Sequence, residues 1–302
     1  MRINIAKLYT YEGAQYELVP ILSNEWEYMY KLVAVDLDET LLNDARHVPS
    51  RVRRAIELAR AKGVYIVPSS GRSFAIMQYI LDEIGAKDMK GEYAISCNGA
   101  CITENAHNTI IDLQPPTPWD FCNKIWKHGI QLGNVGVHVY TLASIYTTKW
   151  RDDDRNIFTV TGIPAIETRE PDLEFLRNTH IVKILYMNND FSYLQQLAHD
   201  MRDLTRDVGV TFSSNCYMEF TPKGISKGDA LRRLAHHLGI DMSETIAVGD
   251  SANDSEMIKA AGLGVCMANA DDSMKAQADY VTQDNNNEGG VAEVIEKFVL
   301  GA

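Results

Sequence analysis

The chain of 302 residues lacks several features that would each point to a particular class of protein. No apolar run approaches the roughly 18 residues that a membrane-spanning helix needs. The formal net charge is −12, so there is no basic excess of the kind that binds nucleic acid or an anionic membrane. Internal repeats and low-complexity tracts are also missing. We therefore expect a globular protein whose partners include neither nucleic acid nor a membrane.

Cysteine is scarce, and its spacing matches no zinc site. An odd number of cysteines does not form a complete disulfide framework. We expect these thiols to be buried and reduced, as in a cytoplasmic protein. The five cysteines are Cys97, Cys101, Cys122, Cys216 and Cys266.

The most informative segment is Val33 to Leu42, in which a short apolar run ends in two aspartates one residue apart. The run predicts a buried strand over 32–35, so Asp36 and Asp38 would follow its carboxyl end. Ligands bind at this edge of an open α/β sheet. Two carboxylates held close together repel each other unless a cation or a shared proton relieves them. An isolated Asp-x-Asp is more often a turn, so the metal or acid–base interpretation needs support from other segments.

Two further segments contain residues that could bind an anion. After the apolar run that begins at Tyr65, Ser70, Gly71 and Arg72 precede a helix predicted for about 73–84. That helix start could bind an anion, although a simple N-cap explains the pattern equally well. Lys227 begins another predicted helix, where a lysine opposes the helix dipole unless an anion lies nearby. A solvated surface lysine is the default interpretation of Lys227 alone.

A third apolar run begins at Thr245 and ends in Gly249, and it is followed by the acidic loop that contains Asp250 and Asp254. Carboxylate oxygens are the ligands that Mg²⁺ prefers. Four segments in this order, each near a predicted strand end or helix start, make an isolated turn the weaker interpretation of Asp36 and Asp38.

These segments resemble the four motifs of the haloacid dehalogenase-like hydrolases. The motifs are Asp36-Leu37-Asp38-Glu39-Thr40, Ser70-Gly71-Arg72, Ser226-Lys227-Gly228 and Gly249-Asp250-Ser251-Ala252-Asn253-Asp254. The resemblance covers about residues 30 to 300. It is greatest to the Cof-type branch, which also has an Asn-Gly-Ala element like that at Asn98, and whose members are mostly phosphatases of sugar phosphates and other small phosphometabolites. Glu39 stands where glycine is common in the family, and Ser70 where threonine is common.

Strand and helix patterns alternate from Lys31 onward, which predicts a parallel sheet. Three prolines within 115–118 interrupt this order and read as a linker. We predict a discontinuous core over 29–113 and 214–302 with a domain inserted over 114–213. The resemblance implies a doubly wound, parallel-sheet (Rossmann-like) α/β core and an α/β cap of the C2 type. Residues 1–28 are predicted to be an N-terminal extension, or to precede a true start at Met29.

The resemblance and the chemistry of these residue types imply a Mg²⁺-dependent phosphatase that forms an aspartyl-phosphate. Asp36 is expected to be the nucleophile and Asp38 the general acid and base, while Ser70 and Lys227 hold the phosphoryl oxygens. Asp36 and Asp250 are expected to ligate Mg²⁺, Asp254 to bind it directly or to hold its waters, and the resemblance adds the backbone carbonyl of Asp38. The candidates for substrate or phosphate binding are Leu37, Thr40, Gly71, Arg72, Asn98, Gly99 and Asn253. For Arg72, a structural ion pair is an equally good interpretation.

Alternative functions stay open. A receiver module of a signalling system also phosphorylates an aspartate, but the spacing of Asp36 and Asp38 and the inserted domain disfavour it. A phosphomutase or phosphotransferase with the same intermediate fits the motifs, as does a silent relative that only binds a phosphometabolite. The expected partner is a small phosphorylated metabolite: sugar phosphates lead, while nucleotides, pyridoxal phosphate, flavin mononucleotide and thiamin precursors remain candidates. The sequence does not distinguish a monomer from a homodimer.

Overall fold

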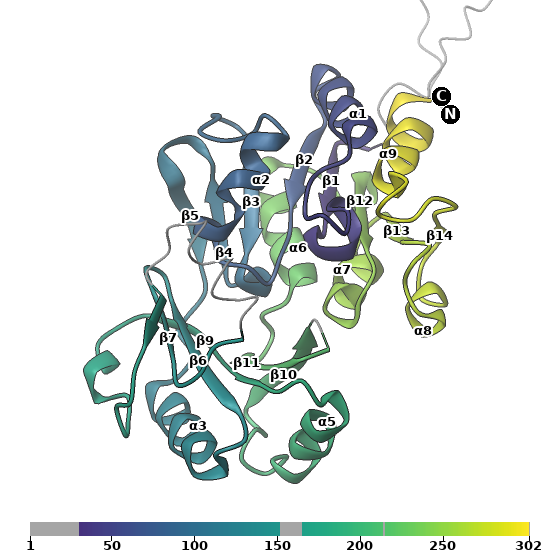
Figure 1. The fold of residues 1–302 in the computed structure, drawn as a ribbon. Coiled ribbons are helices and arrows are strands. Elements are labelled where there is room, and N and C mark those ends of the chain that lie inside the picture. The colour runs from purple at the N-terminus through teal and green to yellow at the C-terminus, as the bar shows by residue number, and fades with distance from the viewer. Residues whose placement is uncertain (1–29, 152–164, 214, 302) are drawn as a thin grey trace, which may run out of the picture.

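The computed structural model describes residues 30–151, 165–213 and 215–301. The predicted N-terminal segment 1–28 lies outside the described residues. Figure 1 shows two parts, a core that contains both ends of the described chain and a second part built by the middle of the sequence. No helix within the described ranges is long and apolar enough to cross a membrane.

Five parallel strands form the core sheet, in the order β14-β13-β12-β1-β2. The central strand β1 (Leu32–Val35) lies between β12 (Thr245–Gly249) and β2 (Tyr65–Pro68). Alternate residues of β1 enter two different apolar clusters: Val33 packs with α1 and α9, and Leu32 packs with α6 and α7. Helices therefore cover both faces of the sheet, which explains why its strands are continuous apolar runs.

The remaining core elements follow the helix and strand alternation that the sequence predicts, except for three consecutive strands between residues 93 and 113. They are α1 (Ser50–Ala61), α2 (Gln78–Glu83), β3 (Tyr93–Ser96), β4 (Cys101–Glu104), β5 (Thr109–Leu113), α6 (Lys227–Leu238), α7 (Ser255–Ala260), β13 (Leu263–Cys266), α8 (Asp272–Lys275), β14 (Tyr280–Val281) and α9 (Gly290–Ile295).

Strand β3 differs from the sequence prediction. It was expected to join the parallel sheet, but it pairs antiparallel with β4 in a separate sheet of order β3-β4-β5. A single parallel bridge, between Ser69 and Ile95, connects it to the end of β2. The reason is local: Asn98 and Gly99 adopt positive φ angles of 55° and 98°, and this turn sends the chain straight back into β4.

The second part is a six-stranded sheet of order β10-β11-β9-β6-β7-β8, antiparallel except between β7 and β8. Helices α3 and α5 pack on one face of this sheet, and Figure 1 shows them on the side away from the core. The opposite face is turned toward the core. The elements are α3 (Trp119–Leu132), β6 (Gly136–Thr141), β7 (Ile145–Thr147), β8 (Ala165–Glu167), β9 (Ile181–Met187), α5 (Phe191–Asp200), β10 (Val208–Ser213) and β11 (Tyr217–Pro222).

This sheet extends beyond the boundary that the sequence predicted. The inserted domain was expected to end at 213, but β11 pairs with both β10 and β9. We therefore propose that the inserted unit includes β11 and that the chain returns to the core after Pro222.

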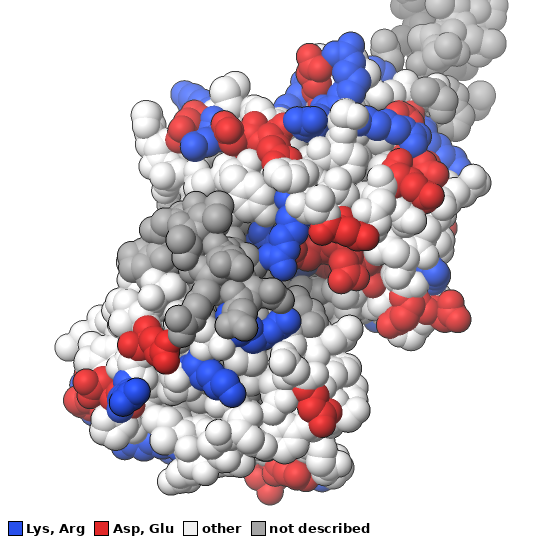
Figure 2. Space-filling view, in the orientation of Figure 1, with Lys and Arg blue, Asp and Glu red and all other residues white. Residues whose placement is uncertain are grey.

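Charged side chains are mixed over the surface that Figure 2 shows. Among the coloured residues of that face, Lys and Arg alternate with Asp and Glu over both parts of the molecule. The coloured residues of that face form no continuous basic area.

Candidate active site

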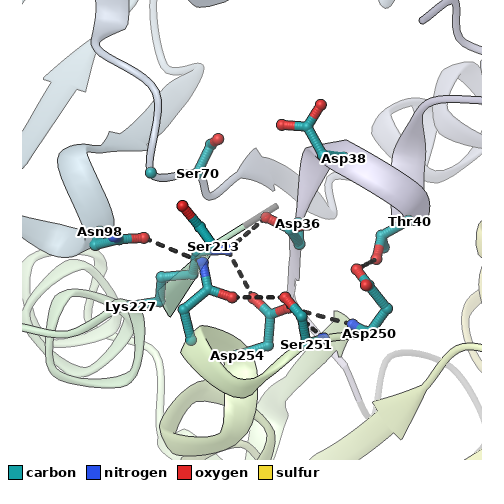
Figure 3. A network of polar contacts seen from close by, with 12 residues as sticks. Asp36, Asp38, Thr40, Ser70, Asn98, Ser213, Lys227, Asp250, Ser251 and Asp254 are labelled. Carbon is teal, nitrogen blue, oxygen red and sulfur yellow. Dashed lines mark hydrogen bonds and ion pairs between the residues drawn. The ribbon is translucent and has the colours of Figure 1, made fainter. Parts of the chain in front are cut away.

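Three acidic side chains meet at the carboxyl edge of the core sheet. Asp36 follows β1 and Asp250 follows β12, and these two strands are parallel neighbours. Asp254 lies in η7 (Ala252–Asp254), the short helix that leads into α7. Each of the three residues offers a carboxylate oxygen within 4.8 Å of the others, and all three are buried. Figure 3 shows Asp36, Asp250 and Asp254 as neighbours in the site, with the Asp250 carboxylate directed toward Thr40 and the Asp36 carboxylate toward Lys227.

Asp254 and Lys227 hold this group together. One carboxylate oxygen of Asp254, Oδ2, accepts hydrogen bonds from the backbone N–H groups of Asp250 (3.2 Å) and Ser251 (3.1 Å). The other oxygen, Oδ1, accepts from Lys227 Nζ at 2.6 Å. The same ammonium donates to Asp36 Oδ1. Lys227 is the first residue of α6, and its side chain is fully buried, so its position is fixed relative to both aspartates.

The site carries an excess of buried negative charge. Burial, followed by the charge of Asp254, raises the pKa of Asp36 well above its usual range. The same two causes raise the pKa of Asp250 to about 7. Burial by itself would lower the pKa of Lys227, but Asp254 and Asp36 outweigh it and raise this pKa. One ammonium therefore does not neutralise three carboxylates, and the oxygen donors fit a hard divalent cation such as Mg²⁺.

Asp38 lies apart from this cluster. Figure 3 shows its carboxylate directed away from Asp250 and Asp254. It forms a two-pronged ion pair with Arg72, in which Nε donates to Oδ2 at 3.0 Å and Nη2 to Oδ1 at 2.5 Å. Arg72 is also held by Tyr79, whose hydroxyl oxygen accepts from Nη1 at 3.0 Å. The Asp38 side chain is 49% exposed, so an entering ligand can reach it.

Polar groups of the β2 and β3 ends form a second side of the site. Ser70 Oγ accepts a hydrogen bond from the backbone N–H of Arg72 at 3.1 Å. The backbone N–H of Asn98 donates to the carbonyl of Ser70 at 2.9 Å, and Asn253 Nδ2 donates to Asn98 Oδ1 at 3.2 Å. A Cβ at Gly71 would lie only 3.0 Å from Asn98 Oδ1, so glycine permits this close approach.

Three other residues predicted for the site have different surroundings. Thr40 donates to Asp250 Oδ1 at 2.7 Å, so it contacts one of the three clustered carboxylates. The Leu37 side chain packs in the hydrophobic core, which leaves only its backbone for a ligand. Gly99 lies against α6: a Cβ there would come within 2.1 Å of the carbonyl oxygen of Ser226. The conformation and packing of this turn account for Gly99 without a ligand.

The sequence did not predict that the inserted sheet would add charged residues next to the site. Lys183 of β9 and Glu219 of β11 form a buried ion pair of 2.7 Å. They reach the core at the Gly71 carbonyl and at the Asn98 side chain. In the sequence, the sign of this contact was a single charged residue in each of two apolar segments, a lysine within 181–187 and a glutamate within 217–222.

Comparisons with known proteins identify the family. A family model described as haloacid dehalogenase-like hydrolase matches residues 33–295. The 5-amino-6-(5-phospho-D-ribitylamino)uracil phosphatase YcsE of Bacillus subtilis is 32% identical over 275 residues, which cover 89% of this chain and 96% of the relative. The phosphatase YwpJ of the same organism is 30% identical over 300 residues, or 89% of this chain and all of the relative.

Solved structures agree with this assignment. The structure of a haloacid dehalogenase-like hydrolase from B. subtilis superimposes with a TM-score of 0.77 at 27% identity, covering 88% of this chain and 99% of the other. A second such hydrolase, from Bacteroides thetaiotaomicron, gives a TM-score of 0.75 at 29% identity over 89% and 99% of the two chains. The chain belongs to the haloacid dehalogenase-like hydrolases, and it is an enzyme of the phosphatase type within that family.

Proposed function

We propose that the protein hydrolyses small phosphate monoesters with the help of Mg²⁺, through a phosphoenzyme on Asp36. The observation that carries this proposal is the position of Asp36: a buried carboxylate that contacts the Lys227 ammonium and lies within 4.8 Å of the Asp250 and Asp254 carboxylates. A carboxylate approaches an anionic phosphate only where neighbouring positive charge offsets the repulsion. Lys227 supplies one such charge.

Asp36, Asp250 and Asp254 would hold the metal ion. When bound, Mg²⁺ supplies charge neutralisation for the phosphoryl oxygens and for these carboxylates. Thr40 supports the arrangement because its hydrogen bond orients the Asp250 carboxylate.

An oxygen of Asp36 would attack phosphorus in line with the leaving oxygen. A bond forms between Asp36 and phosphorus while the bond from phosphorus to the leaving oxygen breaks. Lys227 and Ser70 donate hydrogen bonds to the phosphoryl oxygens during this transfer. Water then attacks phosphorus, inorganic phosphate departs, and the Asp36 carboxylate is restored.

Asp38, after it takes up a proton from solvent, would donate that proton to the leaving oxygen and then accept one from the attacking water. Its exposed carboxylate borders the site, but both of its oxygens accept hydrogen bonds from Arg72. Substrate entry must therefore exchange this ion pair for a contact with the leaving group. Arg72 is then free to contact the substrate.

The substrate class that we propose is a small phosphorylated metabolite of the cytoplasm. One relative is named for a phosphorylated ribitylamino-uracil, and a Yersinia pseudotuberculosis relative, 26% identical over 258 residues, is named HMP-PP phosphatase. The five cysteines are buried and form no disulfide with one another, which suits a reducing compartment.

The test is phosphate release from a panel of sugar phosphates, nucleotides and cofactor phosphates, with Mg²⁺ and with EDTA. We expect release that needs the metal and falls to background in Asp36→Asn, which keeps the side-chain shape but removes the nucleophile. Asp207→Asn is the matched control because that side chain is 87% exposed and far along the sequence from every motif. Normal turnover by Asp36→Asn would refute the nucleophile assignment, and loss of ester without free phosphate would indicate transfer to another acceptor.

A further inference from the structure

Two charged residues of the inserted sheet contact the core beside the phosphate-binding residues. Leu185 pairs with Glu219 across β9 and β11, so Lys183, two residues before Leu185, lies on the same face of the sheet. That face is turned toward the core. The Lys183 and Glu219 side chains are only 4% and 3% exposed, so the pair is enclosed where the two parts meet.

Lys183 fixes one peptide group of the core. Its ammonium donates to the carbonyl oxygen of Gly71 at 3.1 Å, while the N–H of the same peptide group, that of Arg72, donates to Ser70 Oγ at 3.1 Å. The orientation of this peptide therefore depends on a contact from the inserted sheet. Since the Ser70 oxygen accepts this bond, its hydroxyl hydrogen is left for an oxygen of the substrate.

Glu219 fixes a side-chain amide in the same way. Its Oε2 accepts from both Lys183 and Asn98 Nδ2, and its Oε1 accepts from Ser213 at 2.6 Å. A carboxylate accepts only, so the nitrogen of Asn98 must face Glu219 and its oxygen must face Asn253. One N–H of the Asn98 amide is then left for a ligand.

We propose that Lys183 and Glu219 are positioning residues, through which the docked inserted sheet orients Ser70 and Asn98 for phosphate binding. The inference rests on the proposed function, and it names the residues by which the inserted domain controls that site. A buried ion pair is a weak source of stability, because desolvation offsets its attraction. If the inserted sheet moves away from the core, water hydrates both side chains again, so the pair suits a contact that forms and breaks.

The test variant is Lys183→Met/Glu219→Gln, which removes both charges together and leaves no unpaired buried ion. Tyr186→Phe is the matched control: Tyr186 lies on the opposite face of β9 and donates a buried hydrogen bond to the Ile125 carbonyl at 2.7 Å. General weakening of the inserted sheet would change amide exchange and kinetics in both variants. Loss of positioning would change them only in the double variant.

Hydrogen exchange in the absence of substrate gives a readout that does not depend on activity. The amides of Arg72, Cys97 and Asn98 form the hydrogen bonds of this region. We expect their exchange to become about tenfold to a hundredfold faster in the double variant, the range for loss of one hydrogen bond to a charged group. The amides of β12 should keep their rates, and so should all these amides in Tyr186→Phe. Unchanged exchange at these three amides, or an equal change in both variants, would overturn the proposal.

Kinetics with 4-nitrophenyl phosphate and Mg²⁺ gives the second readout. We expect kcat to fall roughly tenfold or more with a smaller change in KM, because the oriented donors act on the transferring phosphoryl group. Ser70→Ala should lower kcat by a smaller factor in the double variant than in the unaltered protein, since Ser70 is already misoriented there. An equal loss of kcat in both backgrounds would contradict the coupling. If the unaltered protein releases no phosphate from any ester of the panel, the proposed function fails. The exchange experiment then still decides the role of Lys183 and Glu219.

Discussion

At the scale of single residues, Lys227 has the most demanding position in the site. Its side chain has no exposed surface, and its ammonium is shared between Asp36 and Asp254. A buried ion that loses its partner is strongly unfavourable, because neither water nor a counter-charge replaces the contact. We therefore expect Lys227 to support the folded state as well as the proposed chemistry.

Removal of this ammonium should destabilise the protein. For Lys227→Met in EDTA, we expect the free energy of unfolding to fall by about 3–5 kcal/mol, the range for breaking a buried ion pair. Urea unfolding followed by circular dichroism measures this change. Mg²⁺ should restore part of the loss by neutralising Asp36 and Asp254, but not phosphate release. A loss below about 1 kcal/mol would mean that the carboxylates are protonated in the folded protein.

The raised pKa of Asp250 predicts how stability depends on pH. Because the pKa rises from 3.8 in the unfolded chain to about 7 in the folded one, the folded state binds more protons between these values. This contribution to stability is complete below pH 4 and is lost as the pH rises through 7. In the proposed site Mg²⁺ binds the ionised carboxylate, so it should stabilise the protein more at pH 8 than at pH 5.

Thermal unfolding at pH 5 and pH 8 tests this dependence. In EDTA, we expect Tm to be higher at pH 5 than at pH 8. This difference should be at least about 3 °C larger in the unaltered protein than in Asp250→Asn. With excess Mg²⁺ the unaltered protein should show a smaller difference. The same pH dependence in Asp250→Asn would assign it to other groups, among them Asp36, whose pKa is raised as well.

At the scale of elements, the site depends on how closely α6 and α7 pack. A Cβ at Gly228 would lie 2.5 Å from the backbone carbonyl of Glu256 in α7. Gly228 follows Lys227, so a residue with a side chain there would push the start of α6, and the lysine with it, away from Asp254.

For Gly228→Ala, we expect a loss of about 1–3 kcal/mol in the free energy of unfolding, as for overpacking in a dense core. We also expect a fall in kcat/KM, because Lys227 moves. Urea unfolding and phosphate release measure the two effects. Arg232→Ala is the control on the same helix: this residue is exposed, and its replacement should change stability by less than about 0.5 kcal/mol.

Sequence patterns predicted the elements that local chemistry defines. The apolar runs of β1, β2 and β12 form the expected parallel strands, and the aspartates after β1 and β12 meet because those strands are neighbours. The patterns did not predict β11 or the antiparallel pairing of β3. Glu219 interrupts the apolar pattern of β11, and its charge partner, Lys183, lies 36 residues earlier in the chain. Nothing local to either residue shows that they meet, nor that Asp38 pairs with Arg72.

At the scale of the whole molecule, most buried apolar side chains belong to one of two units, the core or the inserted unit. The largest core cluster contains residues of the core alone, while a second cluster is confined to the inserted unit. Among the described residues, smaller apolar clusters join the two parts, such as the one that contains Ile76 and Leu185, beside the polar contacts of Lys183 and Glu219. The predicted metal-binding carboxylates all belong to the core. Binding of Mg²⁺ should therefore stabilise the core more than the inserted unit.

Tryptophan fluorescence separates the two bodies, because Trp119, Trp126 and Trp150 follow the linker and Trp26 is the only other tryptophan. In a Trp26→Phe background, tryptophan fluorescence follows unfolding of the inserted unit, and hydrogen exchange in β12 follows unfolding of the core. We expect Mg²⁺ to shift the urea midpoint measured by fluorescence less than the one measured by hydrogen exchange. A ligand stabilises the unit that binds it in proportion to RT ln(1 + [L]/Kd). Equal shifts would mean that both bodies unfold as one cooperative unit. Asp250→Asn should remove the shift in β12, because it takes away one of the three carboxylates that we propose as metal ligands.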